Sequence, residues 1–117
     1  MKYFTLDEFD SPDDKGSGKH MDSNFLARLD EAREIAGVPF KVNSGIRTIA
    51  WNMRVGGRIK SSHLRGVAAD IHCNNSADRS AIIQGLIKAG FTRIGVANSF
   101  IHCDSDTDKP NAIWLYQ

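Results

Sequence analysis

The sequence lacks the features typical of membrane, nucleic-acid-binding and exported proteins. Its longest apolar runs are far too short to cross a bilayer. Basic and acidic residues nearly balance, at 15 and 14 for a net charge of +1, which disfavours nucleic acid and anionic membranes as partners. The first ten residues contain acidic side chains where a signal peptide needs an apolar core. We therefore expect synthesis and retention in the cytoplasm unless another system releases the protein.

Cysteine is scarce, and two common zinc motifs are missing. The two cysteines, Cys73 and Cys103, do not form a Cys-x-x-Cys pair, which disfavours a zinc finger. We expect both to be small buried residues on neighbouring strands, without a disulfide in a reducing cytoplasm. The sequence also lacks His-Glu-x-x-His, the helix-borne motif of common zinc proteases.

The chain is long enough for one domain, which we predict to span residues 1–117. Helical periodicity predicts amphipathic helices over 22–36, ended by Gly37, and over 77–89, capped by Ser76, with a shorter helix over 48–55. Alternating or apolar stretches predict short strands at 40–44, 67–73, 93–97, 99–103 and 112–116. This pattern indicates an α+β fold with a small antiparallel sheet and two main helices.

Residues 61–71 and 100–104 carry the best candidates for a metal site. His63 precedes Gly66, which permits a sharp turn, and Asp70 follows on a predicted strand. Because strand side chains alternate, His102 on a second strand lies beside Asp70 if the two strands pair. Two imidazoles and a carboxylate suit a catalytic zinc site, since three protein ligands leave one position open for water. The alternative is that these histidines are ordinary surface or core residues.

Further segments follow the same order as a known family. The segments are Ser61-x-His63-x-x-Gly66-x-Ala68-x-Asp70, Phe100-Ile101-His102-x-Asp104, Asn43 to Thr48, Asn52-x-x-Val55-Gly56-Gly57, and Trp114. Together they resemble the zinc D-alanyl-D-alanine carboxypeptidase and L-alanyl-D-glutamate endopeptidase family, of peptidase M15 type, with a Hedgehog-like fold. The resemblance runs from about residue 40 to the end of the sequence.

The resemblance implies Zn²⁺ held by His63, Asp70 and His102. Many relatives carry an acid a few residues before the last histidine ligand as the general base, whereas residues 97–99 of this sequence contain none. Asp104, two residues after His102, is therefore our candidate base. The alternative is that Asp104 accepts a hydrogen bond from a metal-bound imidazole and orients the ring.

Three more residues are candidates for substrate contact. Arg47, in the segment that resembles the family's Ser-Gly-Tyr-Arg-Ser, is expected to stabilise the oxyanion or to bind a substrate carboxylate. The alternative is a surface arginine in a salt bridge. Ser61 is placed near the metal or the substrate, or is a simple turn hydroxyl. Trp114 sits where small related peptidases carry a tryptophan. Asp106 and Asp108 are interpreted as solvated loop acids.

These features predict a zinc-dependent peptidase that hydrolyses peptidoglycan stem peptides. It would act as a D-Ala-D-Ala carboxypeptidase or as an L-Ala-D-Glu-type endopeptidase. We expect a monomer without nucleic-acid or membrane partners. A phage or prophage lysis enzyme, released to the cell wall through a membrane pore, fits a chain without a recognisable signal peptide. The alternative is a zinc-stabilised, non-catalytic binding module of the same fold, which the missing upstream acid favours.

Overall fold

Two helices begin and end at residues that satisfy their free backbone groups. The computed structural model describes residues 1–116. Helix α1 (Ser23–Ala36) begins after Asp22, whose carboxylate accepts a hydrogen bond from the N–H of Phe25 at 2.9 Å. It ends at Gly37, which adopts φ of 70°. Helix α3 (Ser76–Lys88) begins one residue earlier than predicted. Asn75, not Ser76, is its cap, because the Asn75 side chain accepts from the N–H of Asp78.

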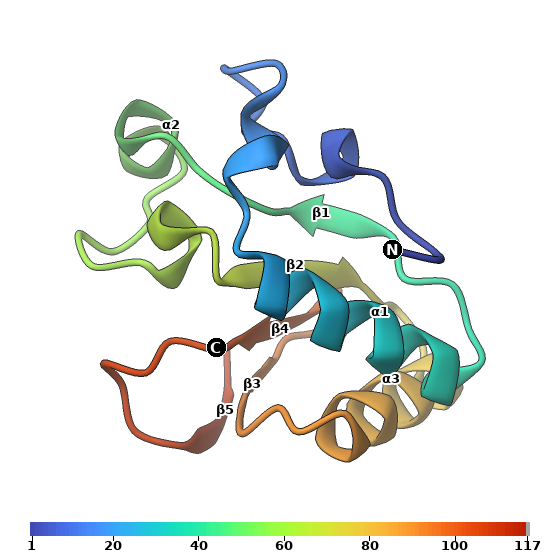
Figure 1. Ribbon diagram of the computed structural model, residues 1–117. Coiled ribbons are helices and arrows are strands. Elements are labelled where there is room, and N and C mark those ends of the chain that lie inside the picture. Colours follow the sequence, from blue (N-terminus) through green and yellow to red (C-terminus); the bar gives the residue numbers. More distant parts are fainter. Residues whose placement is uncertain (117) are drawn as a thin grey trace.

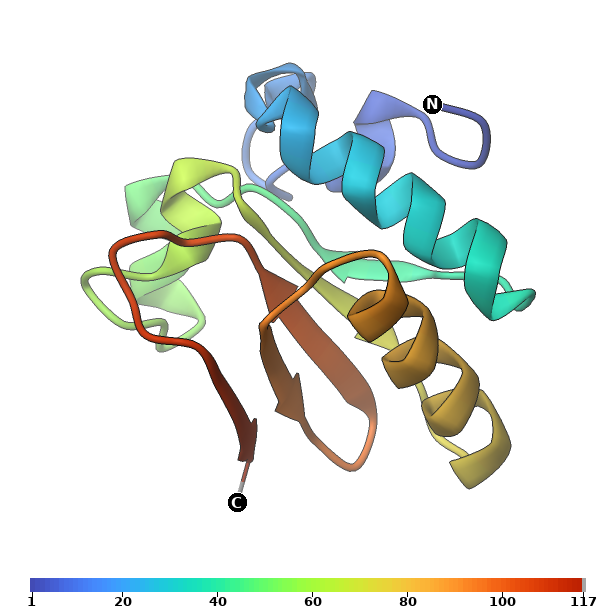
Figure 2. The same cartoon turned by 60° about the horizontal axis from the view of Figure 1, so that its bottom comes forward.

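Helices α1 and α3 lie side by side against the sheet (Figures 1 and 2). Gly85 of α3 faces α1 so closely that an added Cβ would lie 2.5 Å from the carbonyl oxygen of Ala32 and 2.8 Å from the Cβ of Ala36. The small residues at this crossing allow the two backbones to approach. Shorter helical segments complete the fold: 3-10 helices at Leu6–Phe9, Ser17–His20 and Ser62–Arg65, and helix α2 at Ile49–Arg54.

A five-stranded mixed sheet runs in the order β1-β2-β4-β3-β5. The strands are β1 (Val42–Ser44), β2 (Ala68–His72), β3 (Arg93–Val96), β4 (Phe100–Asp104) and β5 (Ala112–Leu115). The α+β class is therefore confirmed, and the pairs β1–β2, β2–β4 and β3–β4 are antiparallel as expected.

The fifth strand departs from the predicted antiparallel sheet, because β5 pairs with β3 in parallel. The loop after β4 reverses the chain, and β3 already occupies the position beside β4. Strand β5 must then lie on the far side of β3. It runs opposite to β4 and so in the same direction as β3.

The two faces of the sheet have different roles. On one face, Ala69 and Ile71 of β2 and Ile101 and Cys103 of β4 pack into the hydrophobic core with α1 and α3. The alternate residues of the same strands point to the other face, where Asp70, Phe100, His102 and Asp104 line a cavity. Cys73 and Cys103 are both buried, as expected, but only Cys103 lies on a strand, because β2 ends one residue before Cys73. No helix within residues 1–116 is both long and apolar enough to span a membrane.

Candidate functional site

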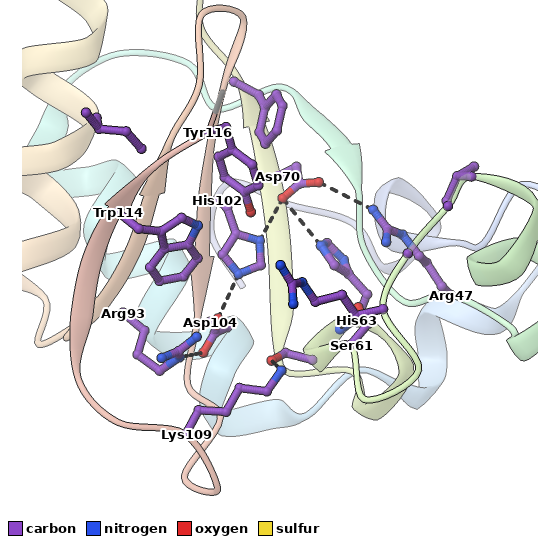
Figure 3. Close-up of a pocket in the computed structure, with 17 residues that line it drawn as sticks. Arg47, Ser61, His63, Asp70, Arg93, His102, Asp104, Lys109, Trp114 and Tyr116 are labelled. Atoms are coloured by element: carbon purple, nitrogen blue, oxygen red, sulfur yellow. Dashed lines mark hydrogen bonds and ion pairs between the residues drawn. The ribbon is translucent and has the colours of Figure 1, made fainter.

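Strand register places two of the candidate metal ligands opposite each other. Asp70 of β2 pairs with His102 of β4. The Oδ1 atom of Asp70 lies 2.9 Å from Nδ1 of His102 (Figure 3). The alternation of side chains along both strands predicts this contact once the two strands are paired in this register.

His63 reaches the same point from the 3-10 helix that precedes β2. The Ser61 hydroxyl accepts a hydrogen bond from the N–H of His63 at 3.2 Å, and Gly66, with φ of 70°, turns the chain towards β2. Nδ1 of His63 lies 2.7 Å from the carbonyl oxygen of Gly45. A carbonyl only accepts hydrogen bonds, so Nδ1 carries the proton and the lone pair of Nε2 is free. That Nε2 lies 3.3 Å from Oδ1 of Asp70.

The three side chains form a cluster that could hold a metal ion. One ligand atom from each of His63, Asp70 and His102 lies within 4.8 Å of the others, and among residues 1–116 they form the only such group. Two imidazole nitrogens and one carboxylate oxygen are a donor set that zinc accepts. The nitrogen of each ring that faces away from the cluster already has a protein acceptor, the arrangement typical of metal-binding histidines.

Electrostatics keep the carboxylates of this cluster ionised. Burial raises the pKa of Asp70, but the hydrogen bond from His102, together with the adjacent His63 ring, outweighs burial and holds the pKa well below its ordinary value. For His102, burial lowers the pKa, whereas the hydrogen bonds to Asp104 and Asp70 raise it, and the net shift is upward. Without an ion, the His102 ring therefore bridges two negative carboxylates.

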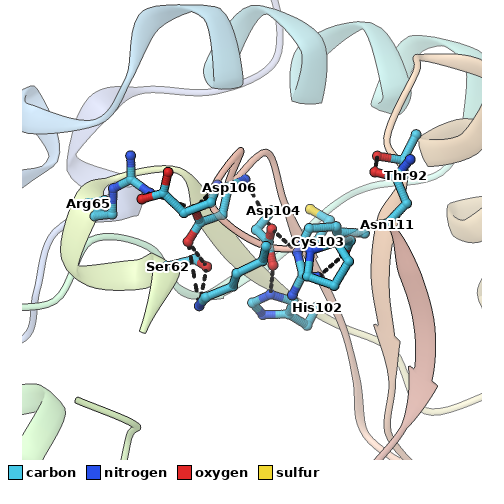
Figure 4. A network of polar contacts seen from close by, with 12 residues as sticks. Ser62, Arg65, Thr92, His102, Cys103, Asp104, Asp106 and Asn111 are labelled. Carbon is cyan, nitrogen blue, oxygen red and sulfur yellow. Dashed lines mark hydrogen bonds and ion pairs between the residues drawn. The ribbon is translucent and has the colours of Figure 1, made fainter. Parts of the chain in front are cut away.

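Asp104 is nearly inaccessible, with 2% of its surface exposed, and both of its oxygens are engaged (Figure 4). Oδ2 lies 2.7 Å from Nε2 of His102. Oδ1 accepts from Nε of Arg93 at 2.7 Å and from the N–H of Asp106 at 3.1 Å. Burial raises the pKa of Asp104, but the hydrogen bonds from His102 and Arg93 lower the pKa by more, so the net shift is downward. This geometry fits a group that orients His102 better than a group that collects a proton from water.

Arg47 is held within the site by several partners. Its Nε donates to the Ser44 hydroxyl at 3.1 Å, and Nη1 donates to Oδ1 of Asn52 at 3.2 Å. Its Nη2 lies 3.6 Å from Oδ2 of Asp70, so the guanidinium faces the candidate metal site (Figure 3). Arg47 thus places a positive charge beside the three clustered side chains.

A cavity of about 750 Å³ opens beside the cluster. The indole of Trp114 forms one wall, with its ring centre 5.4 Å from that of His102. Gly95 makes room for this wall, because an added Cβ would lie 2.7 Å from the Trp114 indole. All the residues singled out from the sequence line this cavity: Arg47, Ser61, His63, Asp70, His102, Asp104 and Trp114.

Sequence reasoning missed or misjudged several residues of the site. Arg93, Lys109 and Tyr116 line the cavity but carry no motif, since only the folded sheet brings β3, β5 and the loop before β5 to this place. The interpretation of Asp106 as a solvated acid is wrong, because it is buried and accepts from the Ser62 hydroxyl at 2.7 Å. Asp108 is exposed, as expected.

The comparison with protein families agrees with this geometry. A family model described as Peptidase M15 matches residues 2–104. The matched range includes all three residues that could hold a metal ion and ends at Asp104, so β5 with Trp114 lies outside it. No curated protein matches the chain.

Proposed function

This chain belongs to the peptidase M15 family, and we propose that it is a zinc-dependent peptidase that hydrolyses peptidoglycan stem peptides. The observation that carries the proposal is the convergence of His63, Asp70 and His102 at one wall of a cavity large enough for a peptide segment. These three residues would hold the ion. When bound there, Zn²⁺ supplies Lewis acidity that activates water near neutral pH.

The remaining residues of the site prepare it for a peptide. Arg47 places its positive charge beside the cluster, where it would stabilise an oxyanion or hold a substrate carboxylate. Trp114 offers a flat apolar wall on which a peptide side chain or backbone can pack. Ser61 lines the cavity and its hydroxyl also fixes the N–H of His63. Asp104 holds Nε2 of His102 and so directs Nδ1 of the same ring at Asp70.

Stem peptides fit the charge of this site, because they carry free carboxylates and the cavity is lined by several basic side chains. Cleavage at D-Ala-D-Ala would make the protein a carboxypeptidase, and cleavage at L-Ala-D-Glu would make it an endopeptidase. Within this proposal, a phage or prophage lysis system releases the protein to the cell wall.

One observation favours a second function, a zinc-stabilised binding module without catalysis. The only acids among the described residues that line the cavity are Asp70 and Asp104, and both are engaged with histidines. A general base would have to leave its partner before it could accept a proton.

Mass spectrometry of fragments released from purified peptidoglycan separates the two functions. The peptidase should release fragments whose ends identify the bond that is cut. A chelator should stop the release, and added Zn²⁺ should restore it. If folded, zinc-loaded protein releases no fragment from peptidoglycan or from D-Ala-D-Ala peptides, the binding module is the correct reading.

A further inference from the structure

The basic side chains around the cavity are not all paired with acids. Four basic side chains line it, and three of them pair with acids at 2.7 to 3.6 Å. The pairs are Arg93 with Asp104, Lys109 with Asp106, and Arg47 with Asp70. The fourth is Arg58, whose guanidinium has no acid or other hydrogen-bond partner within residues 1–116. The cavity therefore carries an unpaired cation at one position.

The backbone at Arg58 is fixed although its side chain is not. Asn52, which is only 3% exposed, donates from Nδ2 to the carbonyl oxygen of Arg58 at 2.8 Å. Its Oδ1 accepts from Nη1 of Arg47 at 3.2 Å, so one buried amide ties the two arginines to each other. The turn that leads from α2 to Arg58 is tight, because a Cβ at Gly57 would lie 2.0 Å from Oδ1 of Asn52. Arg58 is thus presented at a defined place beside Arg47.

We infer that Arg58 is a specificity-determining residue that binds a carboxylate of an anionic peptide substrate. That the ligand is a peptide rests on the proposed function. That the group bound is a carboxylate rests on the unpaired positive charge in the cavity. A guanidinium can pair with a carboxylate through two hydrogen bonds. Arg58 is exposed where it lines the cavity, so its guanidinium is accessible to a ligand. Arg47 is already shared among Ser44, Asn52 and Asp70, so its capacity for a second anion is limited. Arg58 is free to take it.

The test uses a matched pair of ligands with the full-length, zinc-loaded protein. One ligand is a synthetic stem pentapeptide with free carboxylates, and the other is the same peptide with its carboxylates amidated. Stopped-flow tryptophan fluorescence measures binding before turnover, since Trp114 lines the cavity. Arg58→Gln removes the charge, and Arg58→Lys keeps the charge but loses the two-pronged geometry. Arg54→Gln is the control, because Arg54 is exposed, stacks on Trp51 and does not line the cavity.

We expect the unchanged protein to bind the free-carboxylate peptide about five- to tenfold more tightly than the amidated one. Arg58→Gln should abolish this preference, Arg58→Lys should keep part of it, and Arg54→Gln should leave it intact. A merely structural role for Arg58 would weaken both peptides equally. A preference that survives in Arg58→Gln, or that is absent from the unchanged protein, overturns the inference. Binding with this preference but without cleavage refutes the peptidase alone.

Discussion

Replacing Asp104 by alanine tests how the site holds His102. The substitution removes the acceptor of His102 Nε2 and the partner of Arg93, whose side chain is only 12% exposed. Loss of one member of a buried ion pair typically costs about 3–5 kcal/mol, because the other charge stays buried and unpaired. Loss of the acceptor behind a metal-binding imidazole typically weakens metal binding by about 10- to 100-fold.

We therefore expect Asp104→Ala to lower both the free energy of unfolding and the affinity for zinc. Urea unfolding measures the first, and competition with a chromophoric chelator measures the second. Asp104→Asn should have a smaller effect, since its carbonyl oxygen can take the place of Oδ2 at His102 or of Oδ1 at Arg93, but it cannot occupy both positions. The matched control is Asp108→Ala, an exposed acid four residues further along, which should change stability by less than about 0.5 kcal/mol.

The opposite pattern would refute this reasoning. If Asp104→Ala keeps zinc affinity within about twofold while cleavage falls by more than about 100-fold, Asp104 acts on the reacting groups and not through His102. Asp104→Asn would then be as inactive as Asp104→Ala, because an amide cannot accept the proton of water. The base predicted from the sequence would be the correct assignment.

Three other outcomes follow from the structure. Gly95→Ala places a methyl group against Trp114 and Tyr116, so tryptophan fluorescence should shift and KM should rise. An unchanged KM would show that the aromatic wall does not contact substrate. Although burial raises the pKa of Asp106, the hydrogen bond from Ser62 and nearby positive charges hold the pKa below its ordinary value. Asp106 therefore stabilises the fold above about pH 4, and this contribution is lost as pH falls through the pKa of the folded state. Asp106→Asn should reduce the pH dependence of the free energy of unfolding, measured with urea, between about pH 5 and 3. Zinc at about 100 times its dissociation constant should stabilise the protein by about 2.7 kcal/mol in the same assay, and a metal-independent midpoint would contradict the site.

The part of the site that the sequence predicts is the part built on neighbouring antiparallel strands. Alternation along 67–73 and 99–103 places Asp70 and His102 on one face, and the two strands pair in register. The turn at Gly66 then brings His63 to them. Alternation and the glycine turn are local features that short sequence patterns specify well, whereas the pairing of β2 with β4 had to be assumed.

The part that could not be predicted depends on individual side-chain contacts and on the order of strands in the whole sheet. Arg93 reaches Asp104 because β3 lies beside β4, and the sequence of β3 carries no sign of that partner. The direction of β5 depends on which sheet edge is free, which is a property of the whole topology. Asp106 looks like an ordinary loop acid until the loop folds back onto Ser62. Side-chain polarity alone does not reveal such a buried contact.

Some residues that line the cavity lie on strands of the sheet, whereas Arg58 lies on a turn. His102, Asp70 and Asp104 stand on paired central strands, where ladder hydrogen bonds hold each Cα in place. Arg58 stands on the turn between α2 and the next 3-10 helix, which a single buried amide ties to Arg47. Changes in that turn can alter which anionic group is bound without moving the atoms that would hold an ion. Substitutions at residue 58 should therefore change which peptide is preferred while the affinity for zinc stays constant. Substitutions at residue 104 should change the affinity for zinc, whichever peptide is present.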